Sequence, residues 1–282
     1  MIRRAAKLIT QLSFKSLRLV LFLVITSTLV ISCYTAPITG RSQLILLTPS
    51  QENEMGITAF KEVLQTSTIS NNQSYNEAVS RVGNRIVQVA DTPDYEWDFK
   101  VIKDDEQINA FALPGGKVGV YTGILPVAKT EAGLATVMAH EVAHVAARHG
   151  GERVSTGMLA QLGAVGLSAA LGGGDPYVSE AVMQAYGLGA NVGVLLPFNR
   201  GQESEADRIG LIYMAKAGYD PREAVAFWQR MDEAVRGQPQ PPEFLSTHPG
   251  YGTRVRNLQM WLPEAIPYYE NSTKAPNNPI TK

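Results

Sequence analysis

The spacing of apolar residues along the chain predicts mostly helices. A capping box with proline at the first helical position, residues 48–51, opens a helix that reaches about Gln65. Apolar residues recur every three or four positions over 75–89 and predict a second helix, which Pro93 ends. The same criteria predict further helices over 158–171, over 201–217, from Pro221 onward and over 253–262.

Three short stretches follow a different period. Apolar and polar residues alternate over 97–103, 108–113 and 118–121, which indicates strands, and Pro114-Gly115-Gly116 forms a tight turn between the last two. The second and third strands should therefore form a hairpin. The pattern as a whole predicts an α+β fold that is mostly helical, with one small sheet.

The most informative helix is predicted over 130–150, with Thr130 as its N-cap and Gly150-Gly151 as its stop. It carries His140 and His144, which lie on one face because they are four residues apart. That spacing allows two histidines to bind one zinc ion, with Glu141 beside the metal as general base. The alternative is a helix with two solvated or satisfied core histidines, but burying such groups without a partner is costly.

A third ligand is needed from elsewhere in the chain. His149 is out of register for a metzincin-type third histidine, so we interpret it as a surface residue or a support behind the ligands. Glu203 and Asp207 lie one turn apart on a later helix, so one carboxylate can bind zinc and the other can accept a hydrogen bond from a ligand imidazole. Glu205 is expected to face solvent. Without the histidine pair, this stretch would be an ordinary charged helix face.

The amino terminus has the pattern of an export signal. Residues 1–32 hold five basic and no acidic residues and end in an apolar run, and Cys33, the only cysteine, follows that run. This arrangement looks like a bacterial lipobox and predicts lipidation of Cys33, the alternative being an uncleaved anchor. Residues 33–47 are expected to be a tether, 48–262 the folded domain and 263–282 a loosely ordered tail. Without residues 1–32 the chain has 20 basic and 26 acidic residues, which argues against nucleic acid as a partner.

The stretch 154–199 is the least polar part of the rest of the chain, with Asp175 and Glu180 as its only charges. A membrane-embedded hairpin is one interpretation. A run of fourteen apolar residues over 158–171 is too short to cross a bilayer, so we favour a small-residue hairpin packed on the core or a cover over the cleft.

The chain resembles the zinc metallopeptidases related to HtpX, BepA, LoiP and the CAAX prenyl proteases. The resemblance is carried by the metal-site motifs above, by Asn109–Gly116, and by Thr247-His248-Pro249 followed by Arg254. The resemblance implies a compact gluzincin domain, endopeptidase activity and a role in periplasmic protein quality control. It makes Glu203 the third zinc ligand, with Asp207 supporting it. It also makes Asn109–Leu113 an edge strand, where Asn109, Ala110 and Phe111 would bind a substrate backbone.

The resemblance also assigns His248 to the active site, where it would either stabilise the tetrahedral intermediate or hold the fourth zinc position in a latent state. Arg254 would orient that loop or pair with a carboxylate. The chain lacks the several transmembrane helices of embedded relatives and leaves no room for the helical-repeat domain of BepA-like members. We therefore expect a lipid-anchored peptidase at the outer membrane, facing the periplasm. Its expected substrates are misfolded or unassembled envelope proteins, and outer-membrane assembly machinery is a suggested partner. The alternatives are a chaperone-like binding factor with a latent zinc site and, more weakly, an aminopeptidase.

Overall fold

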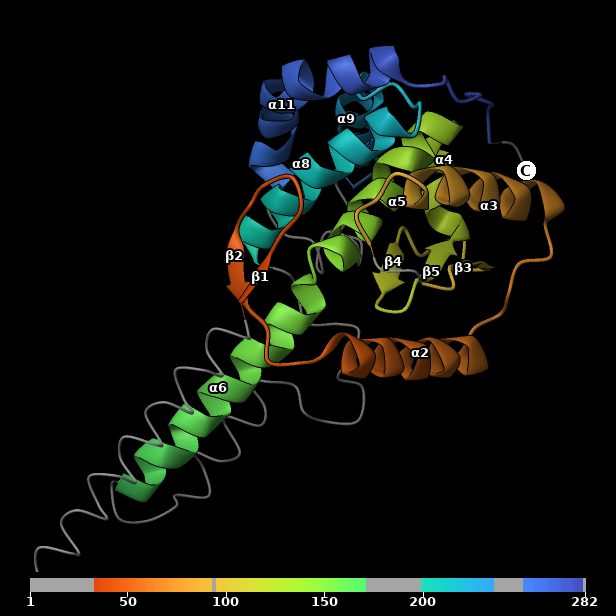
Figure 1. Cartoon of the computed structure of the whole chain (residues 1–282). Coiled ribbons are helices and arrows are strands. Elements are labelled where there is room, and N and C mark those ends of the chain that lie inside the picture. The colour runs from red at the N-terminus through yellow and green to blue at the C-terminus, as the bar shows by residue number, and fades with distance from the viewer. Residues whose placement is uncertain (1–32, 93–94, 171–198, 236–250, 281–282) are drawn as a thin grey trace, which may run out of the picture.

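The computed structural model describes residues 33–92, 95–170, 199–235 and 251–280 (Figure 1). Its elements are β1 (Cys33–Thr35), β2 (Ser42–Leu44), α2 (Pro49–Thr66), α3 (Gln73–Val87), β3 (Asp98–Ile102), β4 (Ala110–Leu113), β5 (Lys117–Tyr121), the 3-10 turn η1 (Thr122–Ile124), α4 (Leu125–Ala128), α5 (Glu131–Ala146), α6 (His149–Ala170), α8 (Arg200–Lys216), α9 (Arg222–Val235) and α11 (Tyr251–Asn271). The predicted fold class, mostly helical α+β with a small sheet, is confirmed.

The larger sheet has three strands in the order β3-β5-β4. β4 and β5 form the predicted antiparallel hairpin, while β3 pairs with β5 in parallel. Gly115 and Gly116 take positive φ values of 81° and 75° in the connecting turn, which explains the glycine pair there. Among the described residues, β4 has no strand on its outer side, so it is an edge of the sheet. β4 is also the strand that packs most closely on α5, the helix with the metal motif.

Helix α5 lies at the centre of the domain, between the sheet, α3, α8 and α9 (Figure 1). Every residue from Glu131 to Ala146 is buried. A helix buried on all sides has no solvent-facing stripe, so its apolar and small residues pack around the whole circumference. Its polar side chains therefore need partners within the protein, and those partners build the site described below.

The end of α5 differs from the prediction. The helix stops at Ala146, and Arg148 takes the left-handed conformation (φ 53°) before α6 begins at His149. The Arg148 guanidinium is held by Glu52 at 2.8 Å and by the Leu47 carbonyl at 3.0 Å, and these contacts offset the unfavourable backbone. The expected stop at Gly150-Gly151 lies inside α6. A Cβ added at Gly151 would lie 1.6 Å from the carboxylate of Glu52, so that side chain would have to move.

The two ends of the predicted domain also differ from the structure. The expected tether, residues 33–47, contains the antiparallel hairpin β1–β2, whose strands of three residues are too short to show a period. The helix predicted to end at Leu262 continues as α11 to Asn271 through Pro263 and Pro267, which would ordinarily end a helix. Part of the expected loose tail packs on the start of α5, where the Glu131 amide donates to the Asn278 carbonyl at 3.0 Å.

Within the described ranges, none of the helices combines the length and the apolar character that a bilayer crossing requires. The predicted helix over 158–171 is found as the second half of α6, which extends away from the body of the domain (Figure 1). The remainder of the stretch 154–199, from residue 171 to residue 198, lies outside the described residues, so its predicted role stays untested.

Candidate metal centre

His140 and His144 on α5 meet Glu203 on α8 at the middle of the domain, and all three side chains are buried. The two histidine Nε2 atoms are 3.1 Å apart. The Glu203 carboxylate lies 3.5 Å from His140 Nε2 and 3.3 Å from His144 Nε2. Zinc binds nitrogen and oxygen ligands tetrahedrally at about 2.0–2.1 Å, so two such ligands are about 3.3 Å from each other. The two contacts of the carboxylate end on different oxygens, and one ligand atom from each of the three residues lies within 4.8 Å of the other two, close enough to hold one metal ion.

The charge of this cluster also suits a cation. Burial lowers the pKa of His140, but the hydrogen bond to Asp207 and the contact with Glu203 outweigh it and raise the pKa to about 9. Burial raises the pKa of Glu203, but both histidines outweigh it and bring the pKa well below its usual range. The site therefore attracts positive charge, and His140, His144 and Glu203 together are a donor set typical of zinc peptidases.

The close approach of α8 to α5 depends on Gly210. A Cβ at this position would lie 2.9 Å from the His140 backbone nitrogen and 3.0 Å from the Ala139 carbonyl carbon. Only a glycine allows the two helices to touch here without displacement. Glu203 and Asp207 reach the histidines because α8 lies directly on α5.

Asp207 and Arg254 lie where the sequence indicated that supporting groups should be. The Asp207 carboxylate is 2.9 Å from His140 Nδ1, so it fixes the ring with Nε2 toward the ligand cluster. Arg254 Nε donates to Asp207 at 2.6 Å, and its terminal nitrogen donates to Glu203. Its guanidinium carbon lies 4.0 Å from the centre of the Trp228 ring. Of the two roles proposed for Arg254, pairing with a carboxylate is confirmed, and it pairs with two.

His149 and Glu205 form a second support, and of the two interpretations of His149 the structure agrees with a support behind the ligands rather than a surface residue. His149 Nδ1 lies 2.9 Å from His144 Nδ1, and His149 Nε2 lies 3.0 Å from Glu205 Oε2. The expectation that Glu205 faces solvent is wrong, because only 7% of it is exposed. Helical geometry does turn it away from Glu203, but α6 and the β1–β2 hairpin cover that side. Neither contact has a sequence signal, because the turn at Arg148 sets the position of His149.

Glu141 is buried beside the two histidines. Burial is the main cause that raises the pKa of its carboxyl to about 8, and the charge of His140 opposes this shift. The carboxyl also makes a hydrogen bond with the Ala112 backbone of β4. The predicted general base is thus next to the edge strand, with a pKa near neutrality that suits proton transfer in both directions.

The three predicted substrate-binding residues lie on or beside β4, and their side chains are engaged within the protein. The Asn109 side-chain oxygen accepts from the Ala110 amide at 2.9 Å, and both residues are buried. The Phe111 ring contacts Phe60 of α2, with ring centres 6.3 Å apart. The outer backbone of the strand is therefore the part that remains to meet a substrate.

Two predicted site residues cannot be placed. His248 lies outside the described residues, and so do its neighbours Thr247 and Pro249. Cys33 begins β1, but its side chain is not described. Their predicted roles stay untested.

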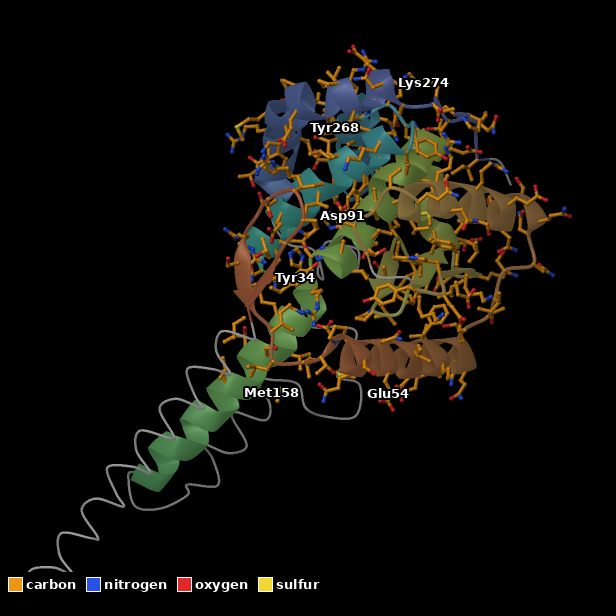
Figure 2. All side chains as sticks on the ribbon, viewed as in Figure 1. Tyr34, Glu54, Asp91, Met158, Tyr268 and Lys274 are labelled. Carbon is orange, nitrogen blue, oxygen red and sulfur yellow. The ribbon has the colours of Figure 1, made fainter. Side chains whose placement is uncertain are left out.

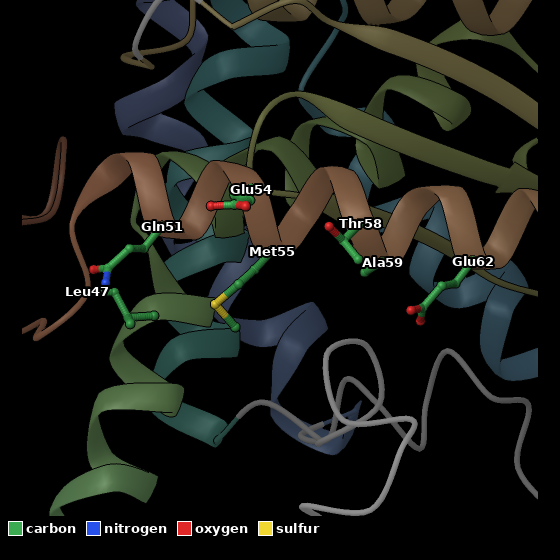
Figure 3. A pocket seen from close by; sticks show the side chains of 7 residues that line it. All are labelled: Leu47, Gln51, Glu54, Met55, Thr58, Ala59 and Glu62. Carbon is green, nitrogen blue, oxygen red and sulfur yellow. The ribbon is translucent and has the colours of Figure 1, made fainter.

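A groove elsewhere on the surface contains none of the predicted site residues. It runs along the outer face of α2 and is lined by Leu47, Gln51, Glu54, Met55, Thr58, Ala59 and Glu62 (Figure 3). Apolar Leu47 and Met55 and acidic Glu54 and Glu62 share this surface, and none of the three candidate zinc ligands is among its lining residues.

An HExxH helix, a glutamate from a following helix and a small sheet with an edge strand beside the glutamate base define a gluzincin-type metallopeptidase domain. The sequence pattern of Peptidase family M48, whose members are zinc-dependent, matches residues 73–262. The chain therefore belongs to peptidase family M48. The predicted resemblance and the predicted enzyme class, a metallopeptidase, are confirmed at the level of the family.

Curated relatives agree with this assignment. The chain is similar to the mitochondrial metalloendopeptidase OMA1 of Schizosaccharomyces pombe, with 40% identity over 81% of this chain and 66% of the relative. Similarity to OMA1 of Saccharomyces cerevisiae is 32% over 84% of this chain and 71% of the relative. The beta-barrel assembly-enhancing protease of Escherichia coli is 31% identical over 77% of this chain and 45% of its own length. The chain thus covers only part of the length of each of these three relatives, from 45% to 71%.

Proposed function

We propose that the protein is a zinc-dependent endopeptidase in which His140, His144 and Glu203 hold one zinc ion and Glu141 is the general base. The observation that carries this proposal is the close approach of His140 Nε2, His144 Nε2 and the Glu203 carboxylate, with contacts of 3.1–3.5 Å, beside a buried glutamate. The family match and the relatives named as metalloendopeptidases support it.

Bound zinc would supply a Lewis acid that polarises the scissile carbonyl and acidifies water. Glu141 would take a proton from the attacking water and pass it to the leaving amine nitrogen, since it is buried beside both histidines and burial raises the pKa of its carboxyl to about 8, within reach of neutral pH. Asp207 would keep His140 in the tautomer that presents Nε2, and Arg254 would hold the Glu203 and Asp207 carboxylates in position.

The substrate backbone would add to the outer edge of β4 as an extra strand. β4 is free of a strand partner on that side among the described residues, and Glu141 contacts its Ala112 backbone. Backbone recognition would make binding tolerant of side-chain sequence and would favour extended, unfolded segments. Asn109 and Phe111 would act by fixing the strand rather than by touching the substrate, since their side chains are engaged elsewhere.

The cellular setting is also a proposal. Residues 1–32 would be a lipoprotein signal, with Cys33 lipidated and the domain held at the outer membrane facing the periplasm. Misfolded or unassembled envelope proteins would be the substrates. The similarity to a protease named for enhancing beta-barrel assembly supports this setting and makes outer-membrane assembly machinery a candidate partner. His248 would occupy the fourth zinc position in a latent resting state.

A chaperone-like binding factor with a latent zinc site is the second candidate. It is favoured by the edge strand, which could hold an unfolded segment without cleaving it. The complete set of ligands and base favours the enzyme.

Zinc content measured together with casein cleavage tests the proposal. The unaltered chain and its Glu141→Gln variant should each hold one zinc, and only the unaltered chain should cleave. Glu131→Gln is a matched control, because Glu131 is equally buried on the same helix and is paired with Arg81 at 2.6 Å, remote from the ligands. Zinc in both chains with cleavage in neither would point to the latent state or to the binding factor, and His248→Ala separates them, because it should restore cleavage only in the latent case. A chain without zinc would refute both candidates.

A further inference from the structure

The β1–β2 hairpin at the amino-terminal end of the described chain is connected to a metal ligand by a continuous line of buried polar contacts. We propose that Arg41 and Thr39 of this hairpin position Glu205 and His149, and that this pair sets the orientation of His144 for zinc. The proposal rests on the proposed zinc site and adds four positioning residues to it.

The first step follows from the donor and acceptor groups. An ionised carboxylate only accepts, so His149 Nε2, 3.0 Å from Glu205 Oε2, carries a proton and donates it. A neutral imidazole has one donor and one acceptor nitrogen, so a His149 ring that donates from Nε2 accepts at Nδ1. His144 Nδ1 lies 2.9 Å from that acceptor, so it is the donor of this hydrogen bond. The remaining nitrogen of His144, Nε2, is thereby left unprotonated and faces Glu203 and His140.

The second step concerns what holds Glu205. The Thr39 hydroxyl donates to one carboxylate oxygen, and Arg41 Nε donates to the other at 2.6 Å. The Arg41 guanidinium supplies the positive charge that favours the ionised carboxylate, and an ionised carboxylate accepts the hydrogen bonds of Thr39, Arg41 and His149. Both donors come from the connection between β1 and β2, about 165 residues before Glu205 in the chain.

The third step is that the hairpin itself is fixed to the metal helix. The Tyr34 hydroxyl donates to the Ala146 carbonyl at 2.8 Å, and buried Gln43 donates to the Ala147 carbonyl. Figure 2 shows Tyr34 at the place where the hairpin meets the start of α6. Arg41 also binds Glu152 of α6 at 2.6 and 2.8 Å. The hairpin therefore has a defined position next to the α5–α6 turn, within one turn of His144.

The hairpin thus supports His144, whereas Asp207 and Arg254 support His140 and Glu203. It lies before residue 73, where the family match begins. Loss of a partner behind a metal-bound histidine typically weakens metal affinity about 10- to 100-fold. A segment that the sequence alone suggested to be a tether should therefore affect zinc binding.

The test measures the zinc dissociation constant by competition with a chromogenic chelator, using the full chain and three variants. His149→Phe keeps an aromatic ring but removes the acceptor for His144, and we expect the constant to rise about 10- to 100-fold. Glu205→Gln and Arg41→Met should each raise it about tenfold. Glu131→Gln is the control, since it makes the same chemical change in a buried glutamate paired with arginine, and it should leave the constant within threefold.

Absorption of the Co²⁺-loaded chains gives a second readout that a loss of stability alone would not change. The visible bands of the three variants should shift relative to the unaltered chain, while those of the control should coincide with it. If His149→Phe or Glu205→Gln does not fold, the zinc constant and the spectrum of Arg41→Met test the proposal. The Arg41 side chain is 37% exposed, so its removal leaves the core intact. Zinc constants and spectra equal to those of the unaltered chain would overturn the proposal, whereas no zinc in the unaltered chain would overturn the zinc site itself.

Discussion

Gly210→Ala tests whether the contact between α5 and α8 sets the geometry of the ligands. The new methyl would lie 2.9 Å from the His140 backbone nitrogen, and ordinary contact begins at 3.4 Å, so the helices must separate by about half an ångström. Metal sites tolerate ligand displacements of only about 0.2 Å. Since Glu203 and Asp207 are on α8 and both histidines are on α5, the displacement falls directly on the cluster.

The expected change in the stability of Gly210→Ala follows from two opposing contributions. Overpacking a tight contact costs about 1–3 kcal/mol, and alanine in a helix interior gains about 0.5–1 kcal/mol over glycine. The net loss of about 1 kcal/mol should lower the melting temperature of the metal-free chain by about 2–4 °C for a protein of this size. Zinc affinity should fall at least tenfold, measured by chelator competition. Gly150→Ala is the control, because no atom lies within 4 Å of its added Cβ, and it should change neither property appreciably. An unchanged zinc affinity in Gly210→Ala would refute this account of how the ligands are positioned.

Three further predictions concern charge and catalysis. Because His140 in the metal-free site has a raised pKa of about 9, zinc must displace its proton at pH 7. The zinc affinity should therefore fall about tenfold for each unit that the pH drops below 9, and a competition titration between pH 6 and 8 that showed no slope would contradict this. Arg254→Met should lower the free energy of unfolding by about 3–5 kcal/mol in a urea titration, because it leaves Glu203 and Asp207 buried without their counter-charge; a loss below 1 kcal/mol would argue against this role. Glu141→Gln should retain zinc and reduce peptide hydrolysis at least about 100-fold in a fluorogenic assay, and retained activity would exclude it as the general base.

The sequence predicted the parts of the site that depend on local geometry. His140, Glu141 and His144 share one helix, and Glu203 and Asp207 share another, so their relative placement follows from the helical repeat. The hairpin β4–β5 followed from alternation and from the Pro-Gly-Gly turn.

The sequence could not predict contacts that depend on how distant elements pack. The burial of Glu205 arises from the β1–β2 hairpin and α6, and the position of His149 arises from the left-handed turn at Arg148. The parallel pairing of β3 with β5 likewise has no local signature. At the other end of the chain, Pro263 suggested a helix end where packing against α8 and α9 sustains α11.

The central claim is that His140, His144 and Glu203 hold zinc, and X-ray absorption at the zinc edge tests it most directly. The purified chain should contain one zinc with nitrogen and oxygen neighbours at about 2.0–2.1 Å and no sulfur. Glu203→Gln should weaken zinc binding and alter the first coordination shell. A sulfur neighbour would place the metal at Cys33, the only cysteine, and that result, or a chain that takes up no zinc, would contradict the account.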